Sequence, residues 1–481
     1  MLDLLVINLG NNTEIYQRVT SPLRAIEPPF WAGLIASFLR GHGHSVAILD
    51  ADADNLSPSQ TVDRVTDYGP SLIAVVVQGV NPSASSTPKM TAAIDLCHKL
   101  KEEYPYKVLV MGLHPSALPE RTLIETGADF VCQGEGFYTL LELLDWLRFG
   151  KQGKIDIQGL HYLGESNNRA QLLPEIRLPP VAWDLLDMTK YRAHNWHCLD
   201  DIDNRQPYGV IYTSLGCPYS CTFCDIHAMY LGNKPSIRFR NPENVIRELD
   251  LIVQKYGVRH IKIIDELFTI NERRVANICD LIIERNYDLN LWAYARVGRV
   301  TSPMLEKMKK AGINWLAYGF ESASEIVRRG VRKGFHQNEI RQAIKMTKDA
   351  GINIMANFIF GLPDDDMESM RATLNMAKEH NFEYVNFYPC FAFPGSKLYD
   401  GAIRNNIALP DTWDGYAPLG PKSLPLPTKY LTSAQVLHFR DKAFQEYFSS
   451  PEYSEMVGKK FGNKAQAYIK RMLQGKLERK Y

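Results

Sequence analysis

Short runs of Val, Ile and Leu recur along this chain, and stretches with the periodicity of helices separate them. Alternating strands and helices are typical of parallel α/β folds, in which helices cover both faces of a sheet. Nearly continuous apolar strands are expected when both faces are buried. The alternation occurs twice, so the sequence predicts two successive α/β units. A chain of 481 residues is long enough for about three domains of roughly 150 residues each.

The first unit, residues 1–150, has predicted strands at residues 4–9, 45–49, 72–77, 107–111 and 130–132. This pattern predicts a flavodoxin-like (Rossmann-like) sheet, whose ligands bind at the carboxyl ends of the strands. The loops at those ends are rich in Gly, Ser, Pro and Asn, so backbone amides can approach a ligand closely. The Gly-x-Gly-x-x-Gly fingerprint of dinucleotide binders is missing after the first strand.

Residues 151–205 interrupt the alternation with prolines and polar residues, and we interpret them as a linker that packs on its neighbours. The second unit covers residues 206–400. Its predicted strands, at residues 210–214, 261–264, 291–296, 315–320, 352–360 and 384–390, predict a parallel sheet that curls into a partial (βα)6 barrel of the TIM type. Residues 401–481 are predicted to form a small, mainly helical region.

Composition excludes several classes of protein. With 45% hydrophobic and 23% charged residues and a formal net charge of +1, the chain is neither a basic nucleic-acid coat nor an acidic disordered protein. No apolar run approaches the roughly 20 residues that span a membrane. The N-terminal segment predicts a strand rather than a signal peptide, so we expect a cytoplasmic protein without a nucleic-acid partner. The last 31 residues carry eight Lys or Arg and three Glu; a solvated helix face explains them, and an anionic substrate or partner is the alternative.

Three of the eight cysteines, Cys217, Cys221 and Cys224, lie close together directly after a predicted strand. Thiolates at this spacing can bind one soft metal centre, either zinc or an iron–sulfur cluster. A structural zinc site or an electron-transfer cluster needs a fourth ligand, and only Asp225 and His227 follow closely. Three thiolates therefore indicate a cubane with one iron left open for a substrate, with structural zinc or coincidence as the alternatives. The other cysteines are isolated and are typical of small buried side chains in a reducing compartment.

The cysteine loop resembles the signature of the radical S-adenosylmethionine (SAM) enzymes, and the similarity extends over roughly residues 206–400. The resemblance implies that Cys217, Cys221 and Cys224 hold a 4Fe–4S cluster, whose open iron chelates the amino and carboxylate groups of SAM. It also implies a role for Phe223, which precedes the third cysteine and matches an aromatic residue that packs on the cluster or on adenine.

Later motifs resemble the same family, each at the carboxyl end of a predicted strand. The segment that begins with Asp265 and Glu266 is similar to an acidic segment that meets the SAM amino group, and Arg296 is similar to a basic residue that faces the SAM carboxylate. Gly319 and Glu321 resemble a motif beside the ribose, and Gly361 resembles a turn near adenine. Each motif also has a structural alternative, because carboxylates cap helices, arginines make ion pairs and glycines occupy turns.

The first unit resembles the cobalamin-binding domain that precedes many radical SAM cores, through residues 28–33, 112–117 and 134–136. The resemblance implies that cobalamin is a further cofactor and that Gln78 and Asn81 lie on a loop facing the lower side of the corrin. The other candidate cofactor-binding residues of this unit are His114, Ser116, Gly134, Glu135 and Gly136. The Asp-x-His-x-x-Gly motif that supplies a histidine to cobalt in other cobalamin proteins is absent, which leaves the axial ligand open.

Together these resemblances imply a cobalamin-dependent radical SAM C-methyltransferase. In such enzymes a flavodoxin or ferredoxin-type donor reduces the cluster, and a 5′-deoxyadenosyl radical abstracts hydrogen from a small-molecule substrate. Methylcobalamin then delivers a methyl group to the unactivated carbon. The alternative is a non-methylating reaction of the same architecture, such as oxidative cyclisation or ring rearrangement. A transfer-RNA methylthiotransferase would need three cysteines in the first unit, which has only Cys97 and Cys132.

Overall fold

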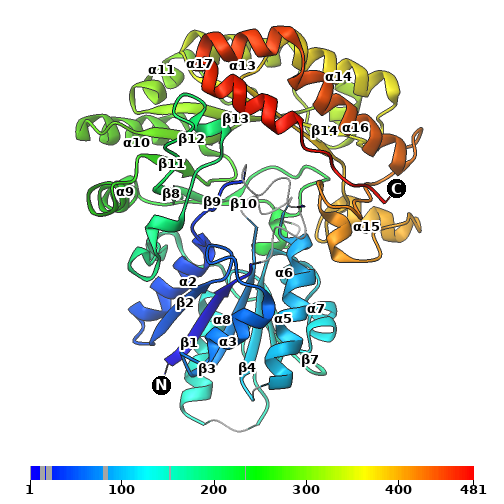
Figure 1. The fold of residues 1–481 in the computed structure, drawn as a ribbon. Helices are drawn as coiled ribbons and strands as arrows, with labels where there is room; N and C mark the ends of the chain where they lie inside the picture. The colour runs from blue at the N-terminus through cyan, green and yellow to red at the C-terminus, as the bar shows by residue number, and fades with distance from the viewer. Residues whose placement is uncertain are drawn as a thin grey trace.

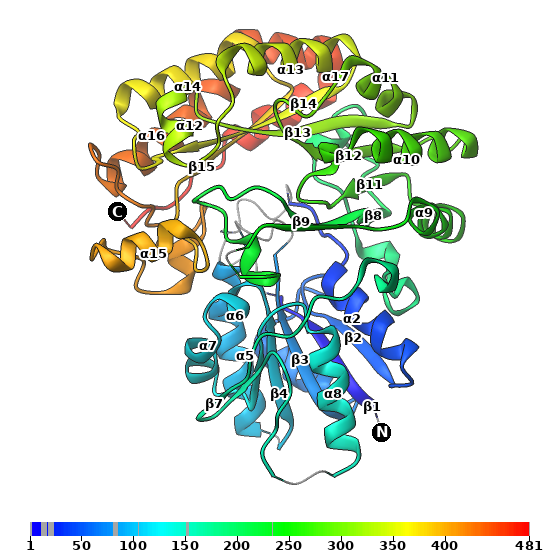
Figure 2. The same ribbon diagram turned by 180° about the vertical axis from the view of Figure 1, so that it is seen from behind.

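Two sheets of mainly parallel strands lie one above the other in the computed structural model, and the carboxyl ends of their parallel strands line a common cavity (Figures 1 and 2). The structure describes residues 2–10, 17, 24–79, 85–103, 105–150, 153–232 and 234–480. The first unit forms the lower part of the molecule in Figure 1, and the second unit forms the upper part together with the C-terminal helices.

The first unit contains a seven-stranded sheet with the order β2-β1-β3-β4-β5-β6-β7. Its first five strands pair in parallel, which confirms the predicted flavodoxin-like order. The strands are β1 (Leu2–Asn8), β2 (Val46–Asp50), β3 (Pro70–Val77), β4 (Lys107–Gly112), β5 (Phe130–Cys132), β6 (Leu160–Tyr162) and β7 (Glu165–Ser166). The helices are α2 (Phe30–Gly41), α3 (Pro58–Val65), α5 (Met90–Glu103), α6 (Leu113–Ala117), α7 (Pro119–Thr126) and α8 (Phe137–Arg148). Because β6 and β7 come from the predicted linker, the sheet extends beyond the predicted boundary at residue 150.

The second unit contains a six-stranded parallel sheet with the order β8-β11-β12-β13-β14-β15. Its outermost strands, β8 and β15, are not paired with each other. The barrel is therefore incomplete, as predicted. The strands are β8 (Tyr208–Ile211), β11 (His260–Ile263), β12 (Asn290–Ala295), β13 (Ile313–Glu321), β14 (Asn353–Phe360) and β15 (Tyr384–Pro389). The helices are α9 (Pro242–Tyr256), α10 (Glu272–Arg285), α11 (Ser302–Lys310), α12 (Glu325–Gly330), α13 (Gln337–Asp349) and α14 (Met367–His380).

The structure differs from the prediction at the start of this barrel. The strand predicted at residues 210–214 is divided, because β8 ends at Ile211 and a second strand, β9 (Ser214–Cys217), begins after a short turn. β9 pairs in an antiparallel hairpin with β10 (Ser236–Phe239), which no sequence signal predicted. The cysteine loop therefore leaves from this hairpin and not from the barrel sheet.

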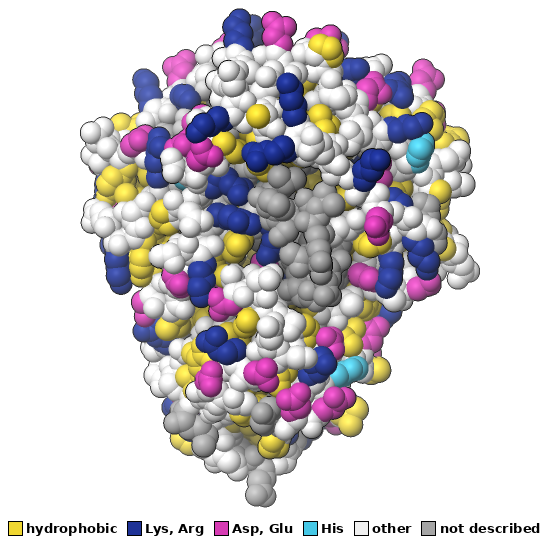
Figure 3. All heavy atoms as spheres, in the orientation of Figure 1, with side chains coloured by type: hydrophobic (Ala, Val, Ile, Leu, Met, Phe, Trp, Pro, Cys, Tyr) yellow, Lys and Arg dark blue, Asp and Glu magenta, His cyan; other side chains and the backbone are white. Residues whose placement is uncertain are grey.

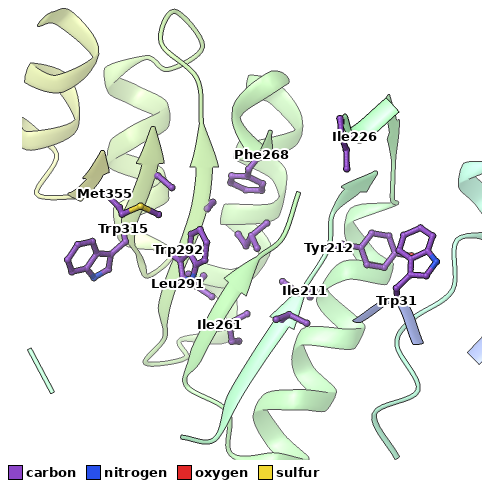
Figure 4. Packing of buried hydrophobic residues seen from close by; sticks show 14 of the residues in the cluster. Trp31, Ile211, Tyr212, Ile226, Ile261, Phe268, Leu291, Trp292, Trp315 and Met355 are labelled. Atoms are coloured by element: carbon purple, nitrogen blue, oxygen red, sulfur yellow. The ribbon is translucent and has the colours of Figure 1, made fainter. Parts of the chain in front are cut away.

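The linker fills the amino-terminal end of the barrel with aromatic side chains. Trp196 lies 5.1 Å from Trp292 and 5.3 Å from Trp315, measured between ring centroids. Figure 4 shows Trp292 and Trp315 with Trp31 of the first unit, and all belong to one hydrophobic core that spans both units. The linker carries short 3-10 helices at Glu175–Arg177, Trp183–Leu185, Met188–Lys190 and Trp196–Cys198. Since this end is closed, access to the barrel interior is at the carboxyl ends of the strands.

The C-terminal region is mainly helical, as predicted, and comprises α15 (Lys397–Arg404), α16 (Ser433–Phe448) and α17 (Pro451–Leu473). α16 packs on β15, where Arg440 donates a hydrogen bond of 2.7 Å to the Phe387 carbonyl. Several basic side chains of this region make ion pairs, including Lys460 with Glu383 at 2.7 Å. None of the described helices is both long enough and apolar enough to cross a membrane.

Candidate active site

A cavity of about 350 Å³ lies between the two sheets, at the carboxyl ends of their strands. Parallel α/β proteins carry their binding sites at these ends, because the loops there are free to present functional side chains. One wall comes from the first unit and the opposite wall from the barrel. The first unit contributes Asn8, Asp52, Val76, Gln78, Gly79 and Lys89, and the barrel contributes residues that include Ile264, Glu266, Arg296, Glu321, Ile359 and Cys390.

The cysteine loop forms another side of the cavity. Cys217, Cys221 and Cys224 are half-buried, and all three line it. The loop begins where β9 ends, and Gly216 has a φ of +91° at this point. A side chain at Gly216 would overlap the carbonyl oxygen of Ser236 in β10. The hairpin therefore fixes the first cysteine at the edge of the cavity.

The three thiols fit an iron–sulfur cluster better than a single metal ion. In the described part of the chain, no group of three His, Cys, Asp or Glu side chains is arranged to hold a single metal ion. A cubane binds each thiolate through a different iron atom, so its cysteines do not have to meet at one point. Burial raises the pKa of the Cys217 thiol to about 11, and a metal has to displace this proton when it binds.

Asp265 is a structural carboxylate. It is fully buried and accepts a hydrogen bond of 2.6 Å from the Thr213 backbone N–H. It also accepts hydrogen bonds from the hydroxyls of Thr213, at 2.5 Å, and Ser214, at 2.6 Å. Asp265 thus fixes the turn that connects β8 to β9 and does not line the cavity.

Glu266 has the opposite orientation and lines the cavity. Its carboxylate accepts hydrogen bonds from the Gly216 N–H at 2.9 Å and from the Tyr230 hydroxyl at 3.0 Å. Burial raises the pKa of Glu266 to about 7. It does not cap a helix, because Asn271 is the N-cap of the next α-helix, α10. A carboxylate beside the first cysteine is suited to bind an ammonium group in the cavity.

Arg296 also lines the cavity. Its guanidinium carbon lies 3.9 Å from the centroid of the Tyr219 ring, and stacking on this ring holds it beside the cysteine loop. Among the described residues Arg296 has no ion-pair partner, so the structural ion pair considered above is not formed. Its charge is available to an anionic group such as a carboxylate.

A third charged group lies at the end of β13. Glu321, at the end of this strand, is buried with a φ of +63° and forms an ion pair with Lys333. A side chain at Gly319 would overlap the carboxylate of Glu321 and the ammonium of Lys333, so glycine gives the pair its space. All three residues line the cavity. Lys333 was not predicted, because it follows α12 without any motif.

Of the two remaining barrel predictions, one lies at the cavity and one does not. Phe223 lines the cavity between the second and third cysteines. Gly361 has a φ of +82°, and a side chain there would overlap Val436 of α16. The Gly361 N–H donates a hydrogen bond of 3.1 Å to Asp365. Gly361 is thus a turn residue covered by a C-terminal helix and is not part of the cavity wall.

Among the predicted cobalamin-binding residues that the structure describes, one lines the cavity and the others do not. Gln78 lines the cavity, and its side-chain oxygen accepts a hydrogen bond of 3.1 Å from the Leu113 N–H. Asn81 lies outside the described residues. The others are placed behind the cavity wall: His114, Ser116, Gly134, Glu135 and Gly136.

Two of these residues have structural partners instead. Glu135 forms a buried ion pair with Arg238 of β10 and accepts a hydrogen bond of 2.9 Å from the Leu173 N–H, so it joins the two units. Ser116 donates a hydrogen bond of 2.6 Å to the Gly112 carbonyl and accepts one of 2.9 Å from the Gly134 N–H. These bonds hold together the loops after β4 and β5.

Buried charges complete the cavity. The Lys89 side chain is buried and lines the cavity, and within the described chain it makes no hydrogen bond or ion pair. Glu27 and Lys262 form a buried ion pair of 3.1 Å that also lines the cavity. His194 of the linker lies 3.3 Å from the same carboxylate. Sequence reasoning missed these residues because none belongs to a motif.

Comparisons with known proteins agree with this arrangement. Residues 211–377 match the family model for the radical SAM superfamily, and residues 18–144 match the model for the B12 binding domain. The chain is 30% identical over 433 residues to an uncharacterized methyltransferase, PH0819, of Pyrococcus horikoshii, with 88% of each chain covered. It is 25% identical over 394 residues to the anaerobic magnesium-protoporphyrin IX monomethyl ester cyclase of Rubrivivax gelatinosus, covering 77% of this chain and 66% of the cyclase.

A solved structure has the same fold over nearly the whole chain. It is that of the radical SAM methyltransferase TsrM of Kitasatospora setae, with cobalamin and a [4Fe-4S] cluster bound. Its TM-score is 0.70 at 15% identity, and the match covers 94% of this chain and 90% of TsrM. The cysteine loop, the partial barrel, the flavodoxin-like unit and these matches place the chain in the radical SAM superfamily, among the members that carry a B12-binding domain.

Proposed function

We propose that the protein is a cobalamin-dependent radical SAM C-methyltransferase, which transfers a methyl group to an unactivated carbon of a small-molecule substrate. One observation carries this proposal: a single cavity is lined both by the three cysteines and by the strand ends of the B12-binding domain. Transfer between two cofactors requires both to face the same substrate, and one shared cavity meets that requirement.

The residues around the cysteine loop are suited to hold SAM at the cluster. The Glu266 carboxylate can accept hydrogen bonds from the SAM ammonium, and Arg296 can donate to its carboxylate. The Glu321–Lys333 pair presents an acceptor and a donor further along the same wall. When bound, the cluster supplies the electron that cleaves SAM and cobalamin supplies the methyl group.

Apolar and aromatic side chains form much of the barrel side of the cavity. Tyr294, Ile359, Tyr388 and Cys390 line the barrel side of the cavity. Removing water protects a reactive substrate radical from side reactions. We further propose that a flavodoxin or ferredoxin-type protein supplies the electron, and that the protein works in the reducing environment of the cytoplasm, where thiols such as its eight free cysteines persist.

A non-methylating reaction is the second candidate, because the chain also resembles the magnesium-protoporphyrin cyclases. The two classes differ in what they do with SAM. A methyltransferase consumes two molecules per turnover and releases S-adenosylhomocysteine and 5′-deoxyadenosine in equal amounts. A cyclase removes hydrogen atoms from its substrate and transfers no methyl group. Its turnover therefore releases no S-adenosylhomocysteine.

The first experiment is anaerobic reconstitution with iron, sulfide and hydroxocobalamin, followed by desalting and quantification of both cofactors. We expect one 4Fe–4S cluster and one cobalamin per chain. A cluster without cobalamin would refute the methyltransferase proposal, although the radical SAM assignment would stand. Product analysis then assigns the reaction class, because equal amounts of the two nucleosides support methyl transfer and deoxyadenosine alone supports cyclisation.

The predicted cluster ligands are tested by changing Cys217, Cys221 and Cys224 together to Ala. The variant should lose the cluster absorbance and the formation of 5′-deoxyadenosine. The cysteine loop carries no further thiol that could replace the three ligands. Cys279→Ala is the matched control, since this cysteine is buried between the barrel sheet and its helices. Survival of SAM cleavage in the triple variant would show that the ligand assignment is wrong.

A further inference from the structure

We propose that a basic surface on the outer side of the cysteine loop docks an acidic electron-carrier protein that reduces the cluster. This surface, the arginine rim, consists of Arg299, Arg329, Arg332 and Lys397. The inference rests on the proposed function, because it assigns the entry point of an electron that only a cluster-bearing enzyme needs. It adds a location and a partner chemistry that the site itself does not specify.

Backbone hydrogen bonds attach two segments of the rim to the cysteine loop. The N–H of Thr222 donates to the Val331 carbonyl at 3.1 Å, and Val331 directly precedes Arg332. The N–H of Leu398 donates to the Thr222 carbonyl at 3.0 Å, and Leu398 directly follows Lys397. Thr222 lies between Cys221 and Cys224 in the sequence, so both segments meet the loop at its ligands.

A third segment reaches the loop through a side chain. The Arg299 guanidinium donates a hydrogen bond of 2.7 Å to the hydroxyl of Tyr219, which lies between Cys217 and Cys221 in the sequence. Of the other rim residues, Arg329 lies on α12 and Lys397 is the first residue of α15. Three separate segments that carry rim residues therefore contact the cysteine loop.

The charges of the rim are not neutralised by neighbouring side chains. Arg299, Arg329 and Arg332 are exposed and Lys397 is half-exposed, and within the described residues none of the four makes an ion pair. Elsewhere the surface has both signs interspersed, as the face in Figure 3 shows. Unpaired charges of one sign on one patch create a local field that attracts a partner of opposite sign.

Most carboxylates on the elements beside the rim have another partner, and the exception is Asp400 of α15, which is exposed and has no ion pair among the described residues. Glu325 of α12 lies 3.0 Å from the ring of His336, and Glu339 accepts a hydrogen bond of 2.7 Å from the His336 N–H. Asp364 forms an ion pair with Lys429. The rim, with four cationic side chains beside the single carboxylate of Asp400, therefore keeps an excess of positive charge, although the whole chain has a formal net charge of only +1.

The loop is a thin barrier between this surface and the cavity. Pro218 is exposed to solvent, while its neighbour Cys217 lines the cavity. An electron arriving at the rim thus has to cross only the loop itself to reach the ligands. A small acidic protein fits this position, because its negative surface complements the rim and long-range attraction speeds its association.

The test compares two charge reversals of equal size. Arg329→Glu with Arg332→Glu reverses the rim, and Lys459→Glu with Lys470→Glu reverses two exposed lysines of α17 that have no ion pair among the described residues. Each full-length variant is loaded with the cluster alone, and stopped-flow absorbance follows its reduction by a purified, reduced flavodoxin of net negative charge. Reduced methyl viologen, a small cation, serves as the reductant that needs no docking surface.

We expect the rim reversal to lower the second-order rate constant with flavodoxin by about 10-fold or more at low salt. The difference should shrink at physiological salt, where the Debye length is about 8 Å. The α17 reversal should stay near the unchanged chain, and methyl viologen should reduce all three clusters equally. Equal slowing by both reversals, or no slowing by the rim reversal, would overturn the proposal.

A binding measurement keeps the test independent of the cluster. Calorimetric titration of flavodoxin into the chain, with Arg329→Gln and Arg332→Gln as a milder variant, should show binding that weakens in that variant. Unchanged binding would overturn the docking surface. Binding of a short RNA to the rim in place of flavodoxin would overturn it too. A chain that binds flavodoxin at the rim but assembles no cluster would instead refute the proposed function.

Discussion

Asp265 and Glu266 are neighbours in the sequence, but the structure predicts opposite consequences when each is replaced by its amide. Asp265 accepts hydrogen bonds from Thr213, which precedes β9, and from Ser214, the first residue of β9. Its carboxylate also lies 3.5 Å from the buried guanidinium of Arg274. Removing one partner of a buried charge pair costs about 3–5 kcal/mol. Since asparagine keeps one acceptor oxygen, we expect Asp265→Asn to lower the free energy of unfolding by about 3 kcal/mol.

Glu266→Gln should leave the free energy of unfolding almost unchanged. The glutamine oxygen can still accept the hydrogen bond from the Gly216 N–H, so the loss is below about 1 kcal/mol. Binding of SAM should suffer instead, because a hydrogen bond to a charged partner contributes about 1.5–3 kcal/mol, or roughly 10–100-fold in the dissociation constant.

Urea denaturation of the unloaded chain, followed by circular dichroism, measures the first effect. Equilibrium dialysis of SAM with the cluster-loaded chain measures the second. Glu368→Gln is the control, because this carboxylate is exposed in the first turn of α14 and should change neither quantity. The assignment of the two roles would be refuted if Glu266→Gln destabilised the fold as much as Asp265→Asn, or if only Asp265→Asn weakened SAM binding.

Three further predictions concern the first unit. Burial lowers the pKa of His114 to about 3, so the neutral ring contributes stability that is fully present above pH 6.5 and is lost progressively as the pH falls from 6.5 to about 3. The free energy of unfolding should fall by about 1.4 kcal/mol per pH unit over this range, and His114→Asn should remove this slope in urea titrations. Gly112→Ala should lower the free energy of unfolding by more than about 2 kcal/mol, because the residue has a φ of +124° and the added methyl group would overlap the Val77 carbonyl. Gly41→Ala is the control in thermal denaturation, because no atom of the described residues lies within contact distance of a methyl group added there. Lys89→Met should lower the hydroxocobalamin retained after desalting, because the buried Lys89 side chain lines the cavity on the side of the first unit; retention equal to that of the unchanged chain would contradict the reasoning.

The barrel and the flavodoxin-like sheet could be predicted because parallel strands are buried on both faces. The strand predicted at residues 384–390, for example, is found as β15 (Tyr384–Pro389). The hairpin of β9 and β10 could not be predicted in this way. All four residues of β10 are half-exposed, and a segment of four residues is too short for its alternation to be recognised.

The charged residues of the cavity show the same limit at the level of single side chains. Glu266 could be predicted because it belongs to a motif at a strand end. Lys333 contacts Glu321 across a loop and a helix, and Lys262 meets Glu27 from a different unit. Such pairs depend on how the units pack, and local sequence carries no record of that packing.

Packing between the units also gives Glu135 a partner that its local sequence does not predict. It lies in a glycine-rich turn at a strand end, as a ligand-binding residue would, but its carboxylate holds Arg238 of the hairpin that carries the first cysteine. The indole N–H of Trp31 donates a hydrogen bond of 3.2 Å to the carbonyl of the same glutamate. The turn therefore connects the B12-binding domain to the cysteine loop through β10. Because one hydrophobic core spans both units, the distance between the two walls of the cavity is set by close packing and not by a hinge. A fixed separation is what transfer between two cofactors requires, since both must face one substrate in one geometry.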